Sequence, residues 1–510
     1  MPPESAVQKA KAARFTEIER KYDVGESAVS PSFEGLAAVA RIERPPSQSL
    51  DAVYFDTAGH DLAAHRVTLR RRTGGPDEGW HLKLPAGPDA RTEVRAPLDA
   101  APDEGTVPTE LLDVVLAIVR DRPLAPVARI RTQRFVQMLY GADADTEDTG
   151  GSALAEFCDD HVTATAGESE QQWREWELEL VGSTDRALLD RLSNRLLDAG
   201  AAPAGSGSKL ARVLAAATPA DAQAARPEPG DPVHRAVAEQ VGELITWDRA
   251  VRSDTYDSVH QMRVTTRKLR SLLKESEESF GLTDDSWVLD ELRQLAAILG
   301  VARDAEVLAE KYENALDELP VDLIRGPVRE RLVDGARRRY EVGLRRSLAA
   351  MRSPRYFRLL DALDDLATAE PLPAPSGEEP APVTIDAAYR RIRKAAKAAR
   401  AAAAAAAPDR DEALHRIRKS AKRLRYTAAA TGASQVSNAA KTIQTLLGDH
   451  QDAVVSRSHL AQQAEAAHGA GEDTFTYGLL YQREDDLADS AREQLDAALK
   501  KLNKAVRRSS

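Results

Sequence analysis

The spacing of apolar residues changes once along this chain, and that change limits the folds it can adopt. In residues 15–24, 52–56, 81–84, 130–140 and 176–181, apolar and polar side chains alternate, and Gly, Pro and Asp separate the runs. This pattern is typical of antiparallel strands. Beyond about residue 216 the apolar residues recur with helical spacing. The chain is therefore predicted to contain a sheet-rich α+β domain followed by an all-α domain.

Pro-rich segments set the expected domain boundaries. We expect the first domain over residues 14–215, a linker over 216–232 and the helical domain over 233–506. The break EPLPAPSGEEPAP at residues 370–382 divides the helical domain into two bundles, 233–369 and 383–506. Within the first domain, residues 109–120 and 184–199 are predicted to be helices, and Gly200 ends the second.

Composition excludes several classes of protein. Cys158 is the one cysteine among 510 residues, which excludes an intramolecular disulfide and a cysteine-cluster metal site. The first residues lack an apolar signal segment, and no run approaches the roughly 18 apolar residues of a membrane span. The alanine run at 401–407 is too short to span and is read as helix. We expect a soluble cytoplasmic protein.

Charge is unevenly distributed. The net charge of −11 arises in residues 1–230, which hold 26 Lys and Arg against 37 Asp and Glu, whereas residues 231–510 hold 44 of each. This acidity argues against general nucleic-acid binding. Locally, however, residues 390–400 and 415–425 each contain six cations and no acid. Such clusters can attract an anionic partner whatever the overall charge.

An eleven-residue segment is repeated in the helical domain. HQMRVTTRKLR at 260–270 precedes LGVARD at 299–304, and HRIRKSAKRLR at 415–425 precedes LGDHQD at 447–452. Basic residues at i, i+3, i+7 and i+10 share one helix face, which indicates duplicated helices with basic stripes. A third stripe lacks the histidine. The stripes consist of His260, Arg263, Arg267 and Arg270, then His415, Arg418, Lys422 and Arg425, and then Arg390, Arg393, Lys397 and Arg400.

Two alternatives apply to these stripes. A solvated helix face is the ordinary explanation of one basic stripe, but three of the same phase favour contact with phosphates. The histidines could instead bind a metal, because Asp257 and Asp411 lie near them in sequence. Neither histidine has a second ligand at i+4, so we rank metal binding below phosphate contact.

The predicted strands carry charged residues at alternate positions. Glu17, Glu19 and Lys21 share one strand face, as do Glu177 and Glu179. Other strands offer cations: Arg70 and Arg72, His81 and Lys83, and Arg131 or Arg134. If the sheet closes with this face inward, carboxylates and cations share a cavity suited to a divalent cation with an oligophosphate. The sequence contains no glycine-rich phosphate loop, so side chains would have to bind the phosphates.

These segments resemble the CYTH superfamily of triphosphate tunnel metalloenzymes. Its Glu-x-Glu-x-Lys signature stands here as Glu17-Ile-Glu19-Arg-Lys21, and further matches extend over residues 14–215. They include YFDT at 54–57, LRRR at 69–72, LKLP at 82–85, RTE at 91–93, Glu156 to Asp160, ELE at 177–179 and SK at 208–209. The repeated histidine segments resemble the CHAD domain, a helical family associated with polyphosphate.

The resemblance implies an eight-stranded antiparallel tunnel and assigns roles to its residues. Lys21, Arg70, Arg72, Lys83, Arg134 and Lys209 would bind the triphosphate, while Glu17, Glu19, Asp160, Glu177 and Glu179 would ligate Mg²⁺ or Mn²⁺. Glu17, Glu19, Lys21, Glu177 and Glu179 would serve in catalysis. Arg131 is an alternative to Arg134, and Asp159 to Asp160; strand phase and the four-residue offset from Glu156 favour Arg134 and Asp160.

These assignments lead to a metal-dependent inorganic triphosphatase joined to a module that binds long-chain polyphosphate. Alternatives are a non-catalytic polyphosphate-binding protein and an enzyme that acts on nucleoside or thiamine triphosphate or cyclises ATP. The first domain offers no prominent aromatic platform for a base, so inorganic substrates rank first. We also expect no membrane contact and a cytoplasmic location, with polyphosphate granules as a further expected site.

Overall fold

The computed structural model describes residues 13–141, 151–217, 232–283, 286–369, 385–404 and 410–509. The chain divides into two compact units, residues 1–295 with 348–371 and residues 296–347 with 372–510. Of the expected linker at 216–232, residues 216–217 and 232 belong to helices, and the rest lies outside the described residues. The Pro-rich break at 370–382 and residues 405–407 of the alanine run lie outside them too.

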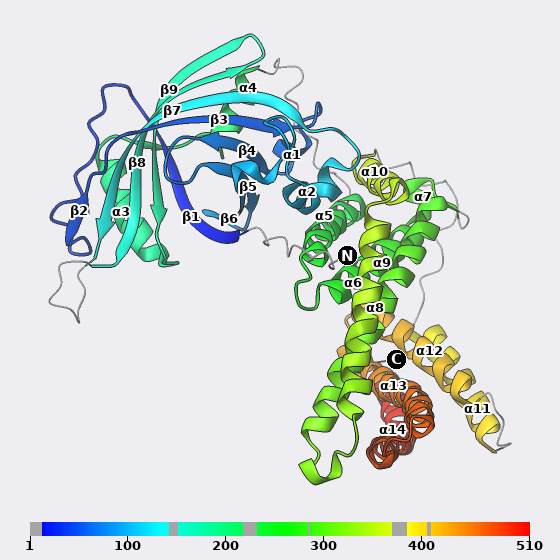
Figure 1. The fold of residues 1–510 in the computed structure, drawn as a ribbon. Coiled ribbons are helices and arrows are strands. Elements are labelled where there is room, and N and C mark those ends of the chain that lie inside the picture. The colour runs from blue at the N-terminus through cyan, green and yellow to red at the C-terminus, as the bar shows by residue number, and fades with distance from the viewer. Residues whose placement is uncertain are drawn as a thin grey trace. The chain divides into compact units, whose positions relative to one another are not determined.

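Eight antiparallel strands close into a barrel, as the resemblance implied (Figure 1). The ring runs β1-β6-β5-β4-β3-β7-β8-β9, and β9 returns to β1. The strands are β1 (Ala13–Val24), β3 (Gln48–Asp56), β4 (Thr68–Thr73), β5 (Gly79–Pro85), β6 (Ala90–Ala96), β7 (Ala125–Tyr140), β8 (Ala153–Ala166) and β9 (Ser169–Leu180). Two short strands, β2 (Arg41–Glu43) and β10 (Ala202–Pro203), pair with β7 and β1.

Closure depends on strand β1. Its first half pairs with β6 as far as Ile18, and its second half pairs on the opposite edge with β9 from Glu19 onward. A single long strand thus joins the two ends of the sheet. This leaves no free edge along most of the ring, which removes the exposed backbone groups of an open sheet.

The outer face of the barrel is apolar where helix α3 (Arg186–Asp198) covers it. Leu188, Leu189, Leu192 and Leu196 of α3 pack with Ile18, Tyr22, Trp176, Leu178 and Leu180 of the strands. Asp185 caps the helix by accepting a hydrogen bond from the Ala187 backbone N–H. The other helix expected in this domain is α2 (Thr109–Val119), and the short helix α1 (Asp61–Ala64) precedes β4.

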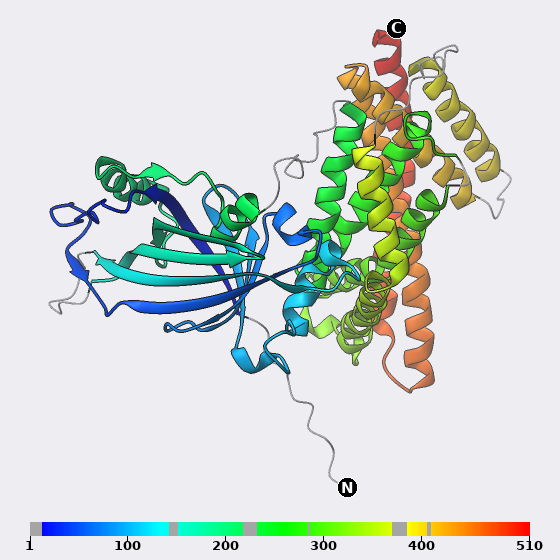
Figure 2. The same ribbon diagram turned by 90° about the horizontal axis from the view of Figure 1, so that it is seen from above.

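Helix α4 (Lys209–Ala217) packs on inward-facing residues of the barrel. Its Leu210, Val213 and Leu214 contact a cluster that includes Ile130, Val162, Ala164 and Trp173. Figure 2 shows the strands curving round as seen from above. Apolar side chains therefore fill one part of the barrel interior, and the ionic residues occupy the remainder.

The chain from residue 232 onward is helical among its described residues, as predicted. The helices are α5 (Pro232–Arg252), α6 (Ser258–Glu275), α7 (Glu277–Phe280), α8 (Trp287–Asp317), α9 (Gly335–Met351), α10 (Pro354–Thr368), α11 (Ile385–Ala404), α12 (Arg410–Ala430), α13 (Ser434–Gly469) and α14 (Phe475–Ser509). The repeated segments begin in corresponding places, since His260 lies on α6 and His415 on α12.

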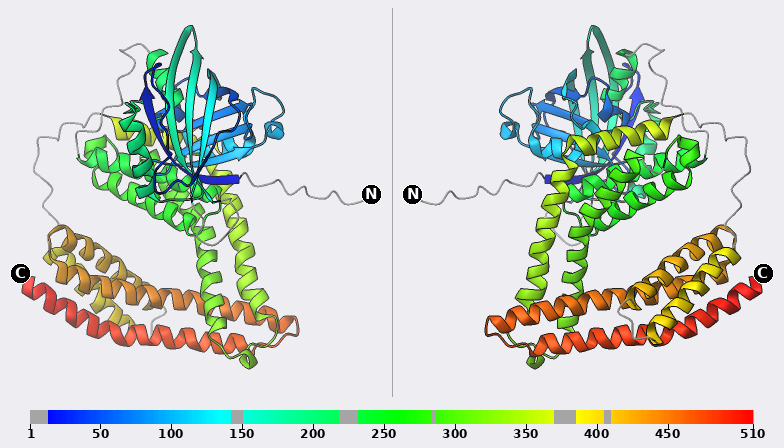
Figure 3. Two further views of the ribbon diagram at one scale, coloured as in Figure 1. Left: turned by 90° about the vertical axis from the view of Figure 1, so that its left-hand side faces the viewer. Right: turned by 90° about the vertical axis from the view of Figure 1, so that its right-hand side faces the viewer.

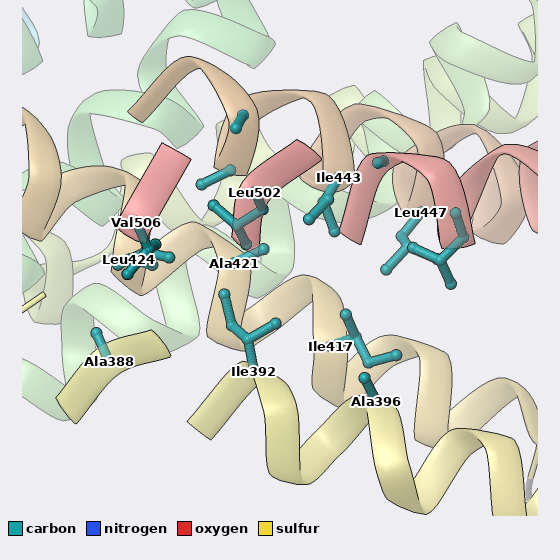
Figure 4. Packing of buried hydrophobic residues seen from close by; sticks show 14 of the residues in the cluster. Ala388, Ile392, Ala396, Ile417, Ala421, Leu424, Ile443, Leu447, Leu502 and Val506 are labelled. Carbon is teal, nitrogen blue, oxygen red and sulfur yellow. The ribbon is translucent and has the colours of Figure 1, made fainter. Parts of the chain in front are cut away.

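Helices α11 to α14 share one apolar core, part of which Figure 4 shows. Ile392 of α11, Ile417 and Leu424 of α12, Ile443 of α13 and Leu502 of α14 are buried together. Figure 3 shows α13 and α14, in orange and red, running alongside each other. Searched over the described residues, the helices include none with the length and apolarity needed to cross a membrane.

Candidate active site

The Glu-x-Glu-x-Lys segment of β1 points into the barrel. Glu17 and Glu19 are only 5% and 8% exposed, yet they lie on the strand face opposite the apolar Ile18 and Tyr22. Strand alternation alone separates the two sets, because successive side chains leave opposite faces. The interior therefore receives carboxylates at two successive inward positions, followed by the Lys21 ammonium.

Strand β9 brings a second set of acids to the same interior. In the β1–β9 ladder, Glu19 lies opposite Glu179 and Lys21 lies opposite Glu177. Glu175, two residues earlier, is also buried. The three carboxyl groups of β9 thus follow one another along the inner face.

Cations hold most of these carboxylates. Glu177 accepts from three of them: Lys21 Nζ lies 2.5 Å from Oε1, Lys209 Nζ 2.7 Å from the same atom, and Arg134 Nη2 2.6 Å from Oε2. Lys83 Nζ lies 2.5 Å from Oε2 of Glu17. Burial alone would raise the pKa of Glu177, but Lys209, Lys21 and Arg134 outweigh it and hold that pKa well below its usual range.

Glu179 differs from its neighbours. It forms no ion pair or side-chain hydrogen bond with any described residue, although it faces the acids of β1. Burial and the charges of Glu17 and Glu19 raise the pKa of Glu179 to about 8. By contrast, Lys21 and Lys83 overcome burial and lower the pKa of Glu19 to about 2. At neutral pH the Glu179 carboxyl group is therefore largely protonated, whereas that of Glu19 is ionised.

Strand β4 contributes two arginines. Arg70 donates from Nη1 to the Tyr54 hydroxyl at 3.3 Å, and Arg72 forms an ion pair with Asp77. The Nε atoms of both arginines are buried without a hydrogen-bond partner among the described residues. Burial and the neighbouring Arg70 lower the pKa of Arg72 to about 10. Such under-used donors suit an anion that brings additional oxygen atoms.

The structure separates the residues of the two alternative pairs. Arg134 binds Asp160 through two hydrogen bonds of 2.8 and 2.7 Å, whereas the side chain of Arg131 is 64% exposed and contacts Asp51. Asp159 lies on the outer face, where Arg174 donates to it from Nε at 2.8 Å and from Nη2 at 2.6 Å. Arg134 and Asp160 are thus the inward members, and strand phase is the reason.

Several interior residues were not among the predicted site residues. His81 bridges the Glu93 carboxylate and the Asp77 carbonyl oxygen, at 2.9 Å each. Extending the period of two by one or two positions finds most of the others. They are Glu93, Arg91 and Arg95 on β6, Cys158 on β8 and Glu175 on β9.

One group of carboxylates in this interior has its ligand atoms close enough together to bind a divalent cation. Ligand atoms of Asp160, Glu175 and Glu177 lie within 4.8 Å of one another, the one such group found among the described residues. Those acids are already paired with Lys209 and Arg134. Glu179, which has no ion pair among the described residues, offers a further oxygen donor beside Glu17 and Glu19, whose carboxylates are paired with Lys83 and Lys21.

Comparison with known proteins decides the family. Residues 16–212 match the CYTH domain and residues 235–461 match the CHAD domain. The chain is a CYTH–CHAD protein. It is 67% identical to Uncharacterized protein Rv2226 of Mycobacterium tuberculosis strain H37Rv over 98% of this chain and 99% of that protein, and equally to MT2285 of strain CDC 1551.

Two solved structures are similar to parts of the CYTH–CHAD protein. The CHAD domain from the plant Ricinus communis covers 52% of this chain and 90% of its own, at 24% identity and a TM-score of 0.38. HpAC1 from Hippeastrum, described as having a dominant triphosphatase activity, covers 39% and 95%, at 19% identity and a TM-score of 0.27. Neither likeness carries an argument about function.

CYTH superfamily enzymes are triphosphate tunnel metalloenzymes. The family found by comparison therefore agrees with the resemblance to CYTH and CHAD domains seen in the sequence. In this CYTH–CHAD protein the barrel interior brings together the residues to which the resemblance assigned catalytic roles: Glu17, Glu19, Lys21, Glu177 and Glu179. The remaining ones also face it: Arg70, Arg72, Lys83, Arg134, Asp160 and Lys209.

The basic stripes of the CHAD domain lie on helix faces, each described within its own unit. On α6, Met262, Leu269 and Leu273 are buried on the side away from His260 and Arg263. Arg418 of α12 lies against α13 at the Leu-Gly segment. Its Nη2 is 3.5 Å from the position that a Cβ on Gly448 would occupy. Arg425 donates to Gln444 at 3.1 Å. The side chains of Arg390, Arg393 and Lys397 on α11 are exposed.

Proposed function

We propose that this CYTH–CHAD protein is a metal-dependent triphosphatase that hydrolyses inorganic tripolyphosphate. The observation that carries the proposal is the set of ion pairs in the barrel, where Lys21, Lys83, Arg134 and Lys209 neutralise the inward carboxylates. Binding of a triphosphate together with a divalent cation would replace these internal ion pairs by contacts with the two ligands. The cations would contact phosphate oxygens, and the carboxylates would contact the metal, so the interior would stay close to neutral.

The residues divide the work by charge. Lys21, Arg70, Arg72, Lys83, Arg134 and Lys209 would hold the phosphates. Glu17, Glu19, Asp160, Glu177 and Glu179 would hold Mg²⁺ or Mn²⁺, which prefer oxygen ligands and supply charge neutralisation for phosphoryl transfer when bound. A carboxylate of this set would orient and deprotonate the attacking water.

Phosphate release from tripolyphosphate tests the proposal. With Mg²⁺ or Mn²⁺ the purified chain should release phosphate, and Glu19→Ala should abolish it. Glu170→Ala is a matched control, since Glu170 lies exposed on β9. Equal turnover by wild type and Glu19→Ala would remove the metal role of Glu19. Strong polyphosphate binding without any phosphate release would instead favour the non-catalytic binding protein.

The CHAD domain would bind long-chain polyphosphate through its stripes. Residues 390, 393 and 397 of α11 expose cations that no described carboxylate contacts. Like charges at helical spacing repel by a few tenths of a kcal/mol per pair, so a bound polyanion relieves them. Competitors can be compared at equal phosphate concentration. If unlabelled polyphosphate displaces the bound polyphosphate and RNA does not, the binding is specific to polyphosphate.

A further inference from the structure

A cavity of about 950 Å³ is lined by Glu19 and Lys21 of β1, by the segment that joins β5 to β6 and by residues of α3 and α4. On this edge β1 pairs with β6 as far as Ile18 and with β10 only from Tyr22 onward. Between these ladders, single backbone bonds join Glu19 N–H to the Asp89 carbonyl and Ala204 N–H to the Lys21 carbonyl. The ladder is interrupted around residue 20, and the cavity borders Glu19 and Lys21 there.

The charges that line the cavity leave one cation without a carboxylate. Its acids on the outer side are Asp89 and Asp190, and Arg20 binds both, at 3.0 and 2.7 Å. Arg66 also lines the cavity and is exposed. Its guanidinium forms no ion pair or side-chain hydrogen bond within the described part of the chain. An anion entering by this route would therefore meet an unneutralised guanidinium.

Arg91 lies between the Arg66 backbone and Glu19. It donates from Nη1 to the Arg66 carbonyl oxygen at 3.3 Å and from Nη2 to the Gly207 carbonyl oxygen at 2.7 Å, and its Nε lies 3.6 Å from Oε1 of Glu19. The cations Lys21, Arg91 and Arg66 all line the same cavity. Ser206 and Ser208 add hydroxyl groups to its wall.

The lining does not suit a nucleoside. Of the residues that line this described cavity, Tyr22 is the one aromatic side chain, and it is 3% exposed because it packs under α3. A base would find no open aromatic face on which to stack. Phosphate oxygens, by contrast, are matched by guanidinium and hydroxyl donors.

We propose that this cavity binds the phosphates of a linear inorganic polyphosphate beyond the three held in the barrel. The inference rests on the proposed triphosphatase function and extends its substrate class to chains of four or more. Water attacks the terminal phosphorus, the bridging P–O bond breaks with its electron pair on the shortened chain, which is the leaving group, and orthophosphate is formed. The proton of the water passes to the inward carboxylate that orients it. Arg66 binds the part of the chain that passes out through the wall.

Arg66→Asn tests this role without straining the backbone. Arg66 has φ of +58°, a conformation that asparagine adopts readily. Loss of one charge-assisted contact should lower kcat/KM for tetraphosphate about tenfold, while kcat/KM for tripolyphosphate stays within about twofold. Ala211→Trp places a large side chain on a lining position of α4. It should likewise lower kcat/KM for tetraphosphate and leave kcat/KM for tripolyphosphate nearly unchanged. Arg44→Asn, on an exposed arginine outside the cavity, should change neither substrate.

The outcomes separate the two proposals. If tripolyphosphate is hydrolysed and Arg66→Asn leaves the ratio of kcat/KM for tetraphosphate to that for tripolyphosphate unchanged, the cavity proposal is overturned and the triphosphatase proposal stands. A selective loss of ATP turnover in that variant also overturns it, because the cavity would then hold a nucleoside. If no substrate is hydrolysed, the triphosphatase fails. Calorimetry then decides the cavity role, since Arg66→Asn must weaken tetraphosphate binding more than tripolyphosphate binding.

Discussion

Glu19 and Glu179 lie directly opposite each other in the β1–β9 ladder, with both carboxyl groups directed into the barrel. Directly opposed like charges destabilise a strand pair. Lys21 contacts Glu19 at 2.8 Å, but no described cation forms an ion pair with Glu179. Burial and the charges of Glu17 and Glu19 therefore raise the pKa of Glu179 to about 8, and its carboxyl group is largely protonated at neutral pH.

Replacing Glu179 with glutamine should have opposite effects on stability and activity. In metal-free buffer at pH 7, Glu179→Gln should raise Tm by about 2–4 °C. The pKa of Glu179 is raised to about 8 in the folded chain, so folding must protonate a carboxyl group that is ionised in the unfolded chain, whereas glutamine is neutral in both states. With Mg²⁺ or Mn²⁺, wild type should gain Tm and the variant much less, since a ligand stabilises the state it binds. Differential scanning calorimetry with and without metal measures both effects.

Glu170→Gln provides the control for that experiment. Glu170 lies exposed on the same strand, β9, so its loss should leave both Tm values and triphosphatase activity unchanged. A metal-dependent rise in Tm of equal size in wild type and Glu179→Gln would contradict a metal role for Glu179.

Arg134 and Arg131 are a matched pair on one strand. Arg134→Gln should lower kcat/KM for tripolyphosphate about 100-fold, because an interior donor is lost and two buried acids lose a partner. Arg131→Gln, at an exposed position beside Asp51, should keep nearly full activity. Steady-state kinetics decides the matter, and equal losses in both variants would count against the interior role of Arg134.

Asp159 is expected to matter for stability alone. Asp159→Asn removes a buried partner of Arg174, which also donates to the carbonyl oxygens of Glu26 and Ala28. The free energy of unfolding should fall by about 3 kcal/mol, while activity per folded molecule is retained. Urea unfolding and a tripolyphosphate assay on the same preparation measure the two quantities. Loss of activity at unchanged stability would place Asp159 in the site instead.

The basic stripes should govern polyphosphate affinity. Arg263→Glu combined with Arg418→Glu should weaken binding of long-chain polyphosphate and flatten its dependence on salt, since fewer counterions are released. Arg345→Glu with Arg483→Glu changes the charge equally at exposed positions outside the stripes. Affinities measured at several salt concentrations should separate the two double variants, and equal curves would refute the stripe contacts.

His459 should make the C-terminal unit sensitive to acid. The Tyr312 hydroxyl and His459 Nδ1 lie 3.0 Å apart, and burial with the nearby Arg339 lowers the pKa of His459 to about 4. Because the unfolded chain binds the proton more readily, stability should fall as pH drops from about 6.5 to about 4 and level off below that. Urea unfolding across this range should show a smaller fall for His459→Gln than for wild type.

His468→Gln is the control for the acid effect, since His468 lies exposed on the same helix, α13. It should follow the wild-type curve. Identical pH profiles in wild type and His459→Gln would show that the buried histidine does not set the acid limit.

Much of the barrel could be predicted from alternation, but β4, β6 and β8 were not among the expected runs, and β4 was indicated only by its alternating Arg70 and Arg72. The β6 sequence ARTEVRA and the β8 sequence ALAEFCDDHVTATA carry charged or small residues on the inward face. That face is ionic, so the apolar alternation that marks a half-buried strand is weak there. Glu93 was matched within the RTE segment but given no role, and Glu175 was missed because the expected run on β9 began one residue later, at Trp176.

Sequence by itself determined the order of the two domains, the duplicated His-headed helices and which strand positions share a face, because these follow from local periodicity. Tertiary structure decided which faces meet. Only closure of β1 onto both β6 and β9 brings Glu19 opposite Glu179, places three cations on Glu177 and opens a cavity beside Lys21. These contacts join residues between 32 and 160 positions apart, and their strength depends on burial that no short stretch of sequence encodes.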